Sequence, residues 1–177
     1  MASNSANRWE TWERCYTRLY DYLWWINEFA ERQDQSTAAH TYRNWIELIG
    51  YPPKKIYEVG SGQGNLIHYL ACYGFKCRGT EITIQRGNKT KLKNPTLSWT
   101  ISDGVNLALF EQSESYDYVI SDQVIEHLHP ADFQKHLKNI SKILKNNGKF
   151  IFRTPHRFIG PSDISALLIV VRHMECI

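Results

Sequence analysis

The chain is poor in cysteine and in net charge, and it has no long hydrophobic run. Its four cysteines (Cys15, Cys72, Cys77 and Cys176) form no CxxC pair, which favours a reduced interior over a disulfide scaffold. A formal net charge of +3 is too small to predict nucleic-acid binding on its own. The apolar run at 166–171 is far shorter than a membrane span, and the first residues lack a secretory signal pattern. We therefore predict a soluble, cytoplasmic protein without a transmembrane segment.

What remains is the composition of an ordinary globular protein, with 42% hydrophobic and 22% charged residues. A length of 177 residues suits one structural domain, a sheet with helices on both faces. Apolar residues at spacings of three and four predict a first helix, with Trp9, Trp12, Tyr16, Leu19 and Leu23 on one face.

A second helix is predicted before residue 50. Ser36 and Thr37 are plausible N-terminal caps for it, and Gly50 followed by Pro52 and Pro53 is expected to end it. Its apolar residues are Ala39, Tyr42, Trp45, Ile46 and Ile49. We therefore divide the chain into an N-terminal helical cap over residues 1–50 and an α/β part over residues 51–177.

From residue 54 the pattern changes to short apolar segments that alternate with helical ones. Strands are expected at residues 54–60, 75–82, 96–101, 116–121 and 149–154, and helices at 65–73 and 130–145. This alternation predicts βαβ units and a mainly parallel sheet in an α/β fold.

The helix at residues 130–145 has the clearest signals. Pro130 suits its first position, and Asn147 with Gly148 is expected to terminate it. Its expected buried stripe is Phe133, Leu137, Ile140 and Leu144. The opposite face has Lys135, Lys138, Lys142 and Lys145, which we interpret as a solvated exterior rather than an RNA or phosphate surface.

The most informative segment is the glycine-rich loop at residues 57–65, between an expected strand and an expected helix. Its glycines permit a tight turn and let a ligand approach the bare backbone, and the following helix N-terminus favours a negative group. A simple strand-to-helix turn is the alternative. A dinucleotide-binding G-x-G-x-x-G would need its third glycine at position 65, which is Asn65.

The spacing Glu58-x-Gly60-x-Gly62-x-Gly64 instead resembles the first motif of class I methyltransferases, which use S-adenosylmethionine. The resemblance continues in order over residues 54–165, and it implies a Rossmann-like, doubly wound fold. In that family an acidic residue ending the second strand, here Glu81, accepts the ribose hydroxyls. A carboxylate after the third strand, here Asp103, faces the adenine amino group. Taken singly, Glu81 could be a solvated strand end, and Asp103 could cap a turn.

The resemblance therefore implies a cofactor site whose members all lie at expected carboxyl ends of strands, where open α/β sheets bind ligands. Its residues are Glu58, Gly60, Ser61, Gly62, Gly64, Glu81, Ile82, Asp103, Gly104, Ser121, Asp122 and Gln123.

His127 is the candidate general base, with Glu126 as its orienting neighbour, for an acceptor that needs deprotonation. A polar loop with a conformational role is the alternative interpretation of this pair. Some metal-dependent relatives have E-x-x-E-H at this place, where a divalent ion binds. Here a neutral amide, Gln123, replaces the first carboxylate, which weakens a hard-cation site, and we predict no metal.

The chain departs from the family after the fifth expected strand. Residues 157–165 resemble the family's next loop, but the remaining residues have room for one short strand or helical turn. We expect the last strands of the family fold to be missing, which would expose a sheet edge.

These observations leave three hypotheses open. The first is a methyltransferase for a small-molecule or lipid-like acceptor, with nucleic acid disfavoured as a partner. The second is a cofactor-binding protein without turnover, and the third is a nicotinamide-dependent oxidoreductase, against which the position of Asn65 argues. The aromatic N-terminal helices, with Trp24 and Trp25, are expected to pack as a cap, and a substrate-lid role is the alternative.

Overall fold

The computed structural model describes residues 35–93, 95–154 and 167–172. Residues from Trp45 onward form one compact unit, separate from the residues up to Asn44. Helix α2 (Gln35–Ile49) runs across this boundary. Its last turn buries Trp45, Ile46 and Ile49, and Gly50 ends it with φ 82°, the left-handed glycine typical of helix C-termini.

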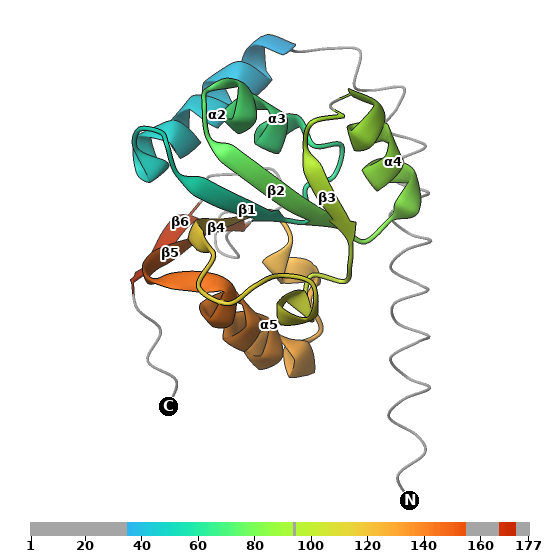
Figure 1. Ribbon diagram of the computed structural model, residues 1–177, viewed down its shortest axis with the longest axis vertical. Coiled ribbons are helices and arrows are strands. Elements are labelled where there is room, and N and C mark those ends of the chain that lie inside the picture. The colour runs from blue at the N-terminus through green and yellow to red at the C-terminus, as the bar shows by residue number, and fades with distance from the viewer. Residues whose placement is uncertain (1–34, 94, 155–166, 173–177) are drawn as a thin grey trace, which may run out of the picture. The chain divides into compact units, whose positions relative to one another are not determined.

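A six-stranded sheet forms the centre of the second unit (Figure 1). Its strands are β1 (Lys55–Val59), β2 (Lys76–Glu81), β3 (Ser98–Ile101), β4 (Tyr116–Asp122), β5 (Leu144–Thr154) and β6 (Leu167–Arg172). Their order is β3-β2-β1-β4-β5-β6. The first five are parallel to their neighbours, and β6 is antiparallel to β5. The predicted α/β fold with a mainly parallel sheet is confirmed, and β6 is a short strand of the kind that the C-terminal residues allow.

Helices cover both faces of this sheet. Figure 1 shows α3 (Asn65–Cys72) and α4 (Ile84–Lys93) on one side and α5 (Pro130–Ile143) on the other. Two single turns of 3-10 helix, η1 (Leu107–Leu109) and η2 (Ile125–His127), lie before and after β4. Parallel strands joined by helices require this layered arrangement, because each crossover must return the chain to the same edge.

Each face of the sheet has its own buried apolar cluster. On the α5 side the cluster consists of Tyr57, Val59, Leu107, Tyr116, Val119, Ile140, Ile143, Phe150 and Phe152. On the α3 side Ile67 packs with Leu97 and Trp99. Successive residues of β1 and β4 are buried on both faces of the sheet, as expected for central parallel strands. The two clusters hold the sheet rigidly between its helices, and the loops that follow the strands lie at its carboxyl edge.

Helix α4 is an element that the sequence analysis missed. It has no apolar stripe, and its hydrophobic residues Ile84 and Leu92 are 61% and 82% exposed. The helix approaches the sheet through Gly87, where a Cβ would lie 2.5 Å from Ile101 Cδ1 and 3.1 Å from Trp99 Nε1. A helix that packs through a glycine leaves no hydrophobic periodicity to detect.

Helix α5 differs from the prediction in its buried face and in its end. Its buried residues are His136, Asn139, Ile140 and Ile143, whereas Phe133 is 36% exposed. The helix ends at Ile143, and β5 begins directly at Leu144. Asn147 and Gly148 therefore do not terminate the helix; they lie in an irregular part of the β4–β5 pairing. The four lysines at 135, 138, 142 and 145 are exposed, as predicted.

Two other predictions concern the N-terminal part. Ser36 and Thr37 lie inside α2 rather than before it, so they are not its caps. The first predicted helix, Trp24, Trp25 and residues 157–165 lie outside the described residues. Within the described part of the chain, no helix is long and apolar enough to cross a membrane.

Candidate functional site

The loop between β1 and α3 contains three glycines in the left-handed conformation. Their φ values are 67° at Gly60, 53° at Gly62 and 73° at Gly64, which L-residues adopt only at a cost. Gly64 precedes α3 directly and, having no side chain, cannot cap the first N–H groups of that helix. Among those groups the Ile67 N–H donates to the Glu58 carboxyl group. A helix N-terminus favours water or a ligand with negative character at its remaining N–H groups.

Two of these glycines have opposite surroundings. A Cβ on Gly60 would lie 2.4 Å from Val124 Cγ2, so the loop after β4 packs directly against the bare backbone here. A Cβ on Gly62 would meet nothing within 4 Å. Gly62 therefore faces open space, which allows a ligand to approach the main chain closely.

Two buried carboxyl groups stand beside this loop. Glu81 ends β2 and is 3% exposed, and its Oε2 accepts the Gly62 N–H at 2.7 Å. Glu58 in β1 is also 3% exposed, and its Oε2 has no hydrogen-bond partner among the described residues. Burial raises the pKa of Glu58 to about 8 and also raises the pKa of Glu81. Such groups are costly to bury, and they are common where a ligand binds.

Asp103 follows β3 and organises the turn that leads to η1. Its Oδ1 accepts the N–H groups of Val105 and Asn106 at 2.8 and 3.1 Å, and its Oδ2 accepts the Asn106 side-chain amide at 2.8 Å. The turn-capping role considered for Asp103 is therefore present. Gly104 has φ 74°, and its carbonyl oxygen accepts a hydrogen bond of 2.8 Å from Nδ1 of the fully buried His136. Helix α5 thus holds this turn in place.

The carboxyl end of β4 is held by β5. Asp122 receives two hydrogen bonds of 2.5 Å from the guanidinium of Arg153, and both side chains are 19% exposed. Gln123 has φ 55°, and its N–H donates to the Arg153 carbonyl oxygen at 2.8 Å. A left-handed backbone is uncommon for glutamine and costs conformational energy, which the contacts around Gln123 must offset. Ser121, which precedes Asp122 in β4, is fully buried.

The candidate catalytic pair lies in η2, after this strained residue. His127 Nε2 is 4.0 Å from Glu126 Oε1, and their side chains are 39% and 22% exposed. Thr154 Oγ1 donates to Glu126 Oε2 at 3.1 Å, so β5 also positions this carboxylate. Burial lowers the pKa of His127, with Glu126 opposing the change. A neutral imidazole here is able to accept a proton.

The structure places every predicted site residue at or next to the carboxyl end of β1, β2, β3 or β4. Ser61 is anchored by its N–H, which donates to the Thr80 carbonyl oxygen at 2.9 Å, and Ile82 is half-buried. No group of three potential ligands in the described part of the chain fits a metal ion. The metal-free site stays a prediction.

Sequence reasoning missed the residues that support the site from behind. Val124 fills the space that Gly60 leaves, and Arg153 pairs with Asp122. Arg153 could have been found, because a charged residue at the end of the expected fifth strand falls level with Asp122 when the two strands are aligned. Nothing in the sequence pattern points to Val124.

Comparisons with known proteins agree with this geometry. The family model of a methyltransferase domain matches residues 57–152. No curated protein is similar enough to count as a match.

Solved structures share the fold. A protein from Pyrococcus horikoshii OT3 is 26% identical with a TM-score of 0.57, over 64% of this chain and 58% of that one. A SAM-dependent methyltransferase from Archaeoglobus fulgidus is 16% identical with a TM-score of 0.64, over 77% and 59%. A TehB-like SAM-dependent methyltransferase from Corynebacterium glutamicum is 20% identical with a TM-score of 0.63, over 81% and 75%. The chain therefore spans less than two thirds of the first two of these proteins.

The family match covers more than half of the chain, and it contains the glycine loop and the acidic strand ends described above. The open space before Gly62 and the buried carboxyl group of Glu81 fit the cofactor of that family. The chain belongs to the methyltransferase-domain family, that is, to the Rossmann-like class I methyltransferases whose cofactor is S-adenosylmethionine.

Proposed function

We propose that the chain is an S-adenosylmethionine-dependent methyltransferase that acts on a small-molecule or lipid-like acceptor. The observation that carries this proposal is the arrangement of the glycine loop, Glu81 and Asp103 along one edge of a parallel sheet. That edge is where open α/β folds bind their ligands.

Each part of this edge has a role in holding the cofactor. Glu81 accepts the ribose hydroxyls, since a buried carboxylate can bind two adjacent hydroxyl groups at once. Asp103 and Gly104 face the adenine, on a turn that the Asn106 and His136 contacts keep rigid. Gly62 and the backbone of residues 121–123 accommodate the methionine part, because the missing side chain at Gly62 permits close approach. Gly60 contributes indirectly, since it lets the loop after β4 pack against the glycine loop. Glu58 and Ser61 support the glycine loop from beneath.

The sulfonium of the bound cofactor makes its methyl group electrophilic. The protein's remaining tasks are to hold the acceptor atom in line and to exclude water. For an acceptor that must lose a proton, His127 is the general base and Glu126 stabilises the imidazolium that forms. Thr154 orients Glu126 through their hydrogen bond of 3.1 Å.

The charge at this edge supports the acceptor class. Its described ionisable side chains are mainly acidic, with Glu81, Asp103, Asp122, Glu126 and Asp132 among them. Arg153 is paired with Asp122. A nucleic acid requires cationic contacts to its phosphates, so this edge favours a small or lipid-like acceptor.

The test is to incubate the full chain with methyl-tritiated S-adenosylmethionine and separate fractions of small metabolites, lipids and RNA. We expect label in the small-molecule or lipid fraction, less label with Glu81→Gln, and a displaced pH profile with His127→Asn. Lys138→Gln, an exposed change on α5, is the control and is expected to behave as the wild type. Label in RNA alone would refute the acceptor class. Cofactor binding without label in any fraction would favour the alternative, a binding protein without turnover.

A further inference from the structure

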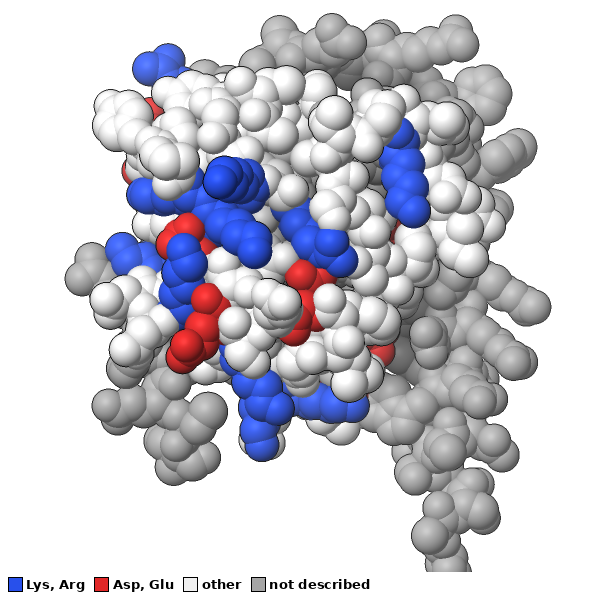
Figure 2. All heavy atoms as spheres, viewed as in Figure 1, with Lys and Arg blue, Asp and Glu red and all other residues white. Residues whose placement is uncertain are grey.

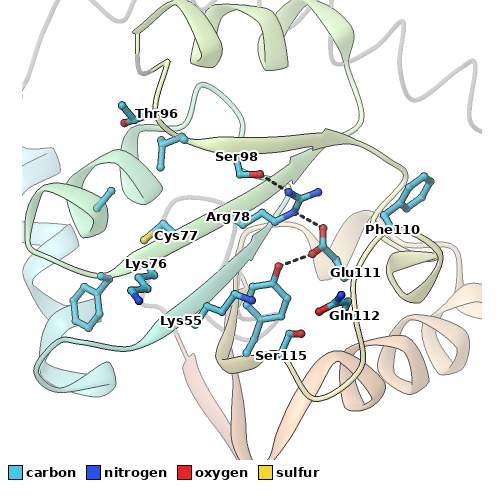
Figure 3. Close-up of a pocket in the computed structure, with 14 residues that line it drawn as sticks. Lys55, Lys76, Cys77, Arg78, Thr96, Ser98, Phe110, Glu111, Gln112 and Ser115 are labelled. Carbon is cyan, nitrogen blue, oxygen red and sulfur yellow. Dashed lines mark hydrogen bonds and ion pairs between the residues drawn. The ribbon is translucent and has the colours of Figure 1, made fainter.

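A cavity of about 630 Å³ lies at the opposite edge of the sheet from the cofactor site (Figure 3). Its lining includes the first residues of four strands, Lys55, Lys76, Ser98 and Tyr116. The length of β2 separates Lys76 from Glu81, which is roughly 17 Å for six residues. The cavity is therefore a separate feature, and the methyltransferase reaction described above does not use it.

The connection from β3 to β4, which contains η1 and no longer helix, contributes Phe110, Glu111, Gln112 and Ser115 to the cavity lining. The face of β2 and β3 beside it is polar, and Arg78 extends along it. The guanidinium of Arg78 donates to Glu111 Oε1 at 2.5 Å, to Thr100 Oγ1 at 2.8 Å and to the Ser98 hydroxyl. Figure 3 shows this group pointing from β2 towards Glu111.

Glu111 provides the carboxylate of the cavity lining, and this carboxylate is already paired with Arg78. Besides Arg78, it accepts a hydrogen bond of 2.5 Å from the Tyr116 hydroxyl, and its side chain is 6% exposed. Arg78, by contrast, is 31% exposed, so its remaining N–H groups can reach a ligand. The buried carboxylate thus fixes the guanidinium without covering it.

Two lysines add positive charge that no described carboxylate neutralises. Lys55 and Lys76 are paired positions in the register of β1 and β2, so their side chains leave the same face of the sheet. Both are exposed. The Lys55 ammonium lies 4.9 Å from the centre of the Tyr116 ring, and neither lysine forms an ion pair with a described residue. Figure 2 shows basic side chains gathered over this part of the surface, with acidic ones between them.

We propose that this cavity binds a small soluble molecule that carries a phosphate monoester. Such a group has a charge of about −1.5 to −2 at neutral pH and three strong acceptor oxygens, which matches two ammonium groups and a fixed guanidinium. Ser98, Ser115 and Gln112 add polar groups to the lining. Phe110, which is 50% exposed, provides an apolar wall for the organic part. The volume lies in the range of small-molecule sites, about 300–1,000 Å³.

The experiment is calorimetric titration of the full chain with glucose 6-phosphate, a phosphate monoester without a base that could enter the adenine site. We expect saturable binding of glucose 6-phosphate, no binding of glucose, and weaker binding at higher salt concentration. Lys76→Gln and Lys55→Gln are each expected to weaken binding about tenfold, because each removes one charge-assisted contact. Both side chains are exposed, so both variants are expected to fold.

Lys138→Gln is the matched control, because it removes the same charge from the exposed face of α5. Equal weakening in the control would show general attraction to a basic protein and overturn the proposal. Competition by S-adenosylhomocysteine would overturn it too, because it would place the ligand in the cofactor site. Binding to phosphatidic acid vesicles without any binding of glucose 6-phosphate would assign the surface to a lipid and refute a soluble ligand.

Discussion

Replacing Gly60 by alanine is expected to destabilise the protein more than the same change at Gly62, and removal of the Val124 side chain is expected to restore part of the loss. Both glycines are left-handed, with φ 67° and 53°, so alanine costs about 1–2 kcal/mol in backbone energy at either position. Only at Gly60 does the new Cβ collide, at 2.4 Å from Val124 Cγ2 and 3.2 Å from Cγ1.

The collision adds the cost of an overpacked site, about 1–3 kcal/mol. Gly60→Ala is therefore expected to lower the free energy of unfolding by about 2–5 kcal/mol, and Gly62→Ala by the backbone cost alone. In a Val124→Ala background both Cγ atoms are gone. The nearest remaining atom is the Val124 Cβ at 3.4 Å, an ordinary contact, so Gly60→Ala should then cost only the backbone term.

Urea denaturation of the wild type, the two single variants and the double variant measures this coupling. We expect Gly60→Ala and Val124→Ala to be non-additive by about 1–3 kcal/mol. Additive free energies would mean that the loop after β4 does not pack against the glycine loop. Gly62→Ala provides the reference for the backbone cost, and its cofactor affinity is expected to fall, because its methyl group points into the open space.

Three further predictions concern buried or strained residues. The pKa of Glu58 is raised from 4.5 to about 8, so its contribution to stability is present below pH 4.5 and is lost as pH rises towards 8. The difference in unfolding free energy between wild type and Glu58→Gln should fall over this pH range, and a constant difference would contradict the burial argument. Burial lowers the pKa of His136 below 6.5, so its contribution to stability is present above pH 6.5 and is lost as pH falls below it. The difference in unfolding free energy between wild type and His136→Gln should therefore fall on acidification, and a rise in this difference would contradict the argument. Gln123→Gly relieves a left-handed residue and should raise the unfolding free energy by about 0.5–1 kcal/mol, whereas a loss of stability would mean that the glutamine side chain stabilises the loop.

The first five strands were predictable because short segments with extended patterns alternate with helical ones along the chain. The start of β5 was not, because this strand begins at Leu144, five residues before its expected first residue. Helix α4 was not, since its contact with the sheet is made by Gly87 and its apolar residues face solvent. Hydrophobic periodicity predicts a helix from its buried apolar side chains, so it does not detect a helix that packs through a glycine.

The buried face of α5 shows a second limit of the same kind. Two polar residues of this helix turn inward because each has a specific partner. His136 donates to the Gly104 carbonyl oxygen at 2.8 Å, and Asn139 accepts the Ala108 N–H at 3.2 Å. Such tertiary partners make buried polar groups acceptable, and no pattern of apolar residues predicts them.

The candidate site was more predictable than the helices that support it. Glu81, Asp103 and the glycines follow from strand order and motif spacing, because parallel strands place their carboxyl ends together. The contacts of Val124 with Gly60 and of Arg153 with Asp122 depend on how the loop after β4 folds back. That fold-back is a tertiary property, and the sequence holds no local signal for it.

We propose above all that the carboxyl edge of the sheet binds S-adenosylmethionine through the glycine loop and Glu81. Calorimetric titration of the full chain with S-adenosylmethionine, S-adenosylhomocysteine and NADH tests it most directly, with Glu81→Ala and Asp103→Asn as variants and Lys138→Gln as control. We expect that both adenosyl ligands bind, that NADH does not, and that the two acidic-site variants lose affinity while the control keeps it. Preferential binding of NADH, or full affinity for S-adenosylhomocysteine in Glu81→Ala, would mean that the cofactor does not bind at this edge in the way proposed.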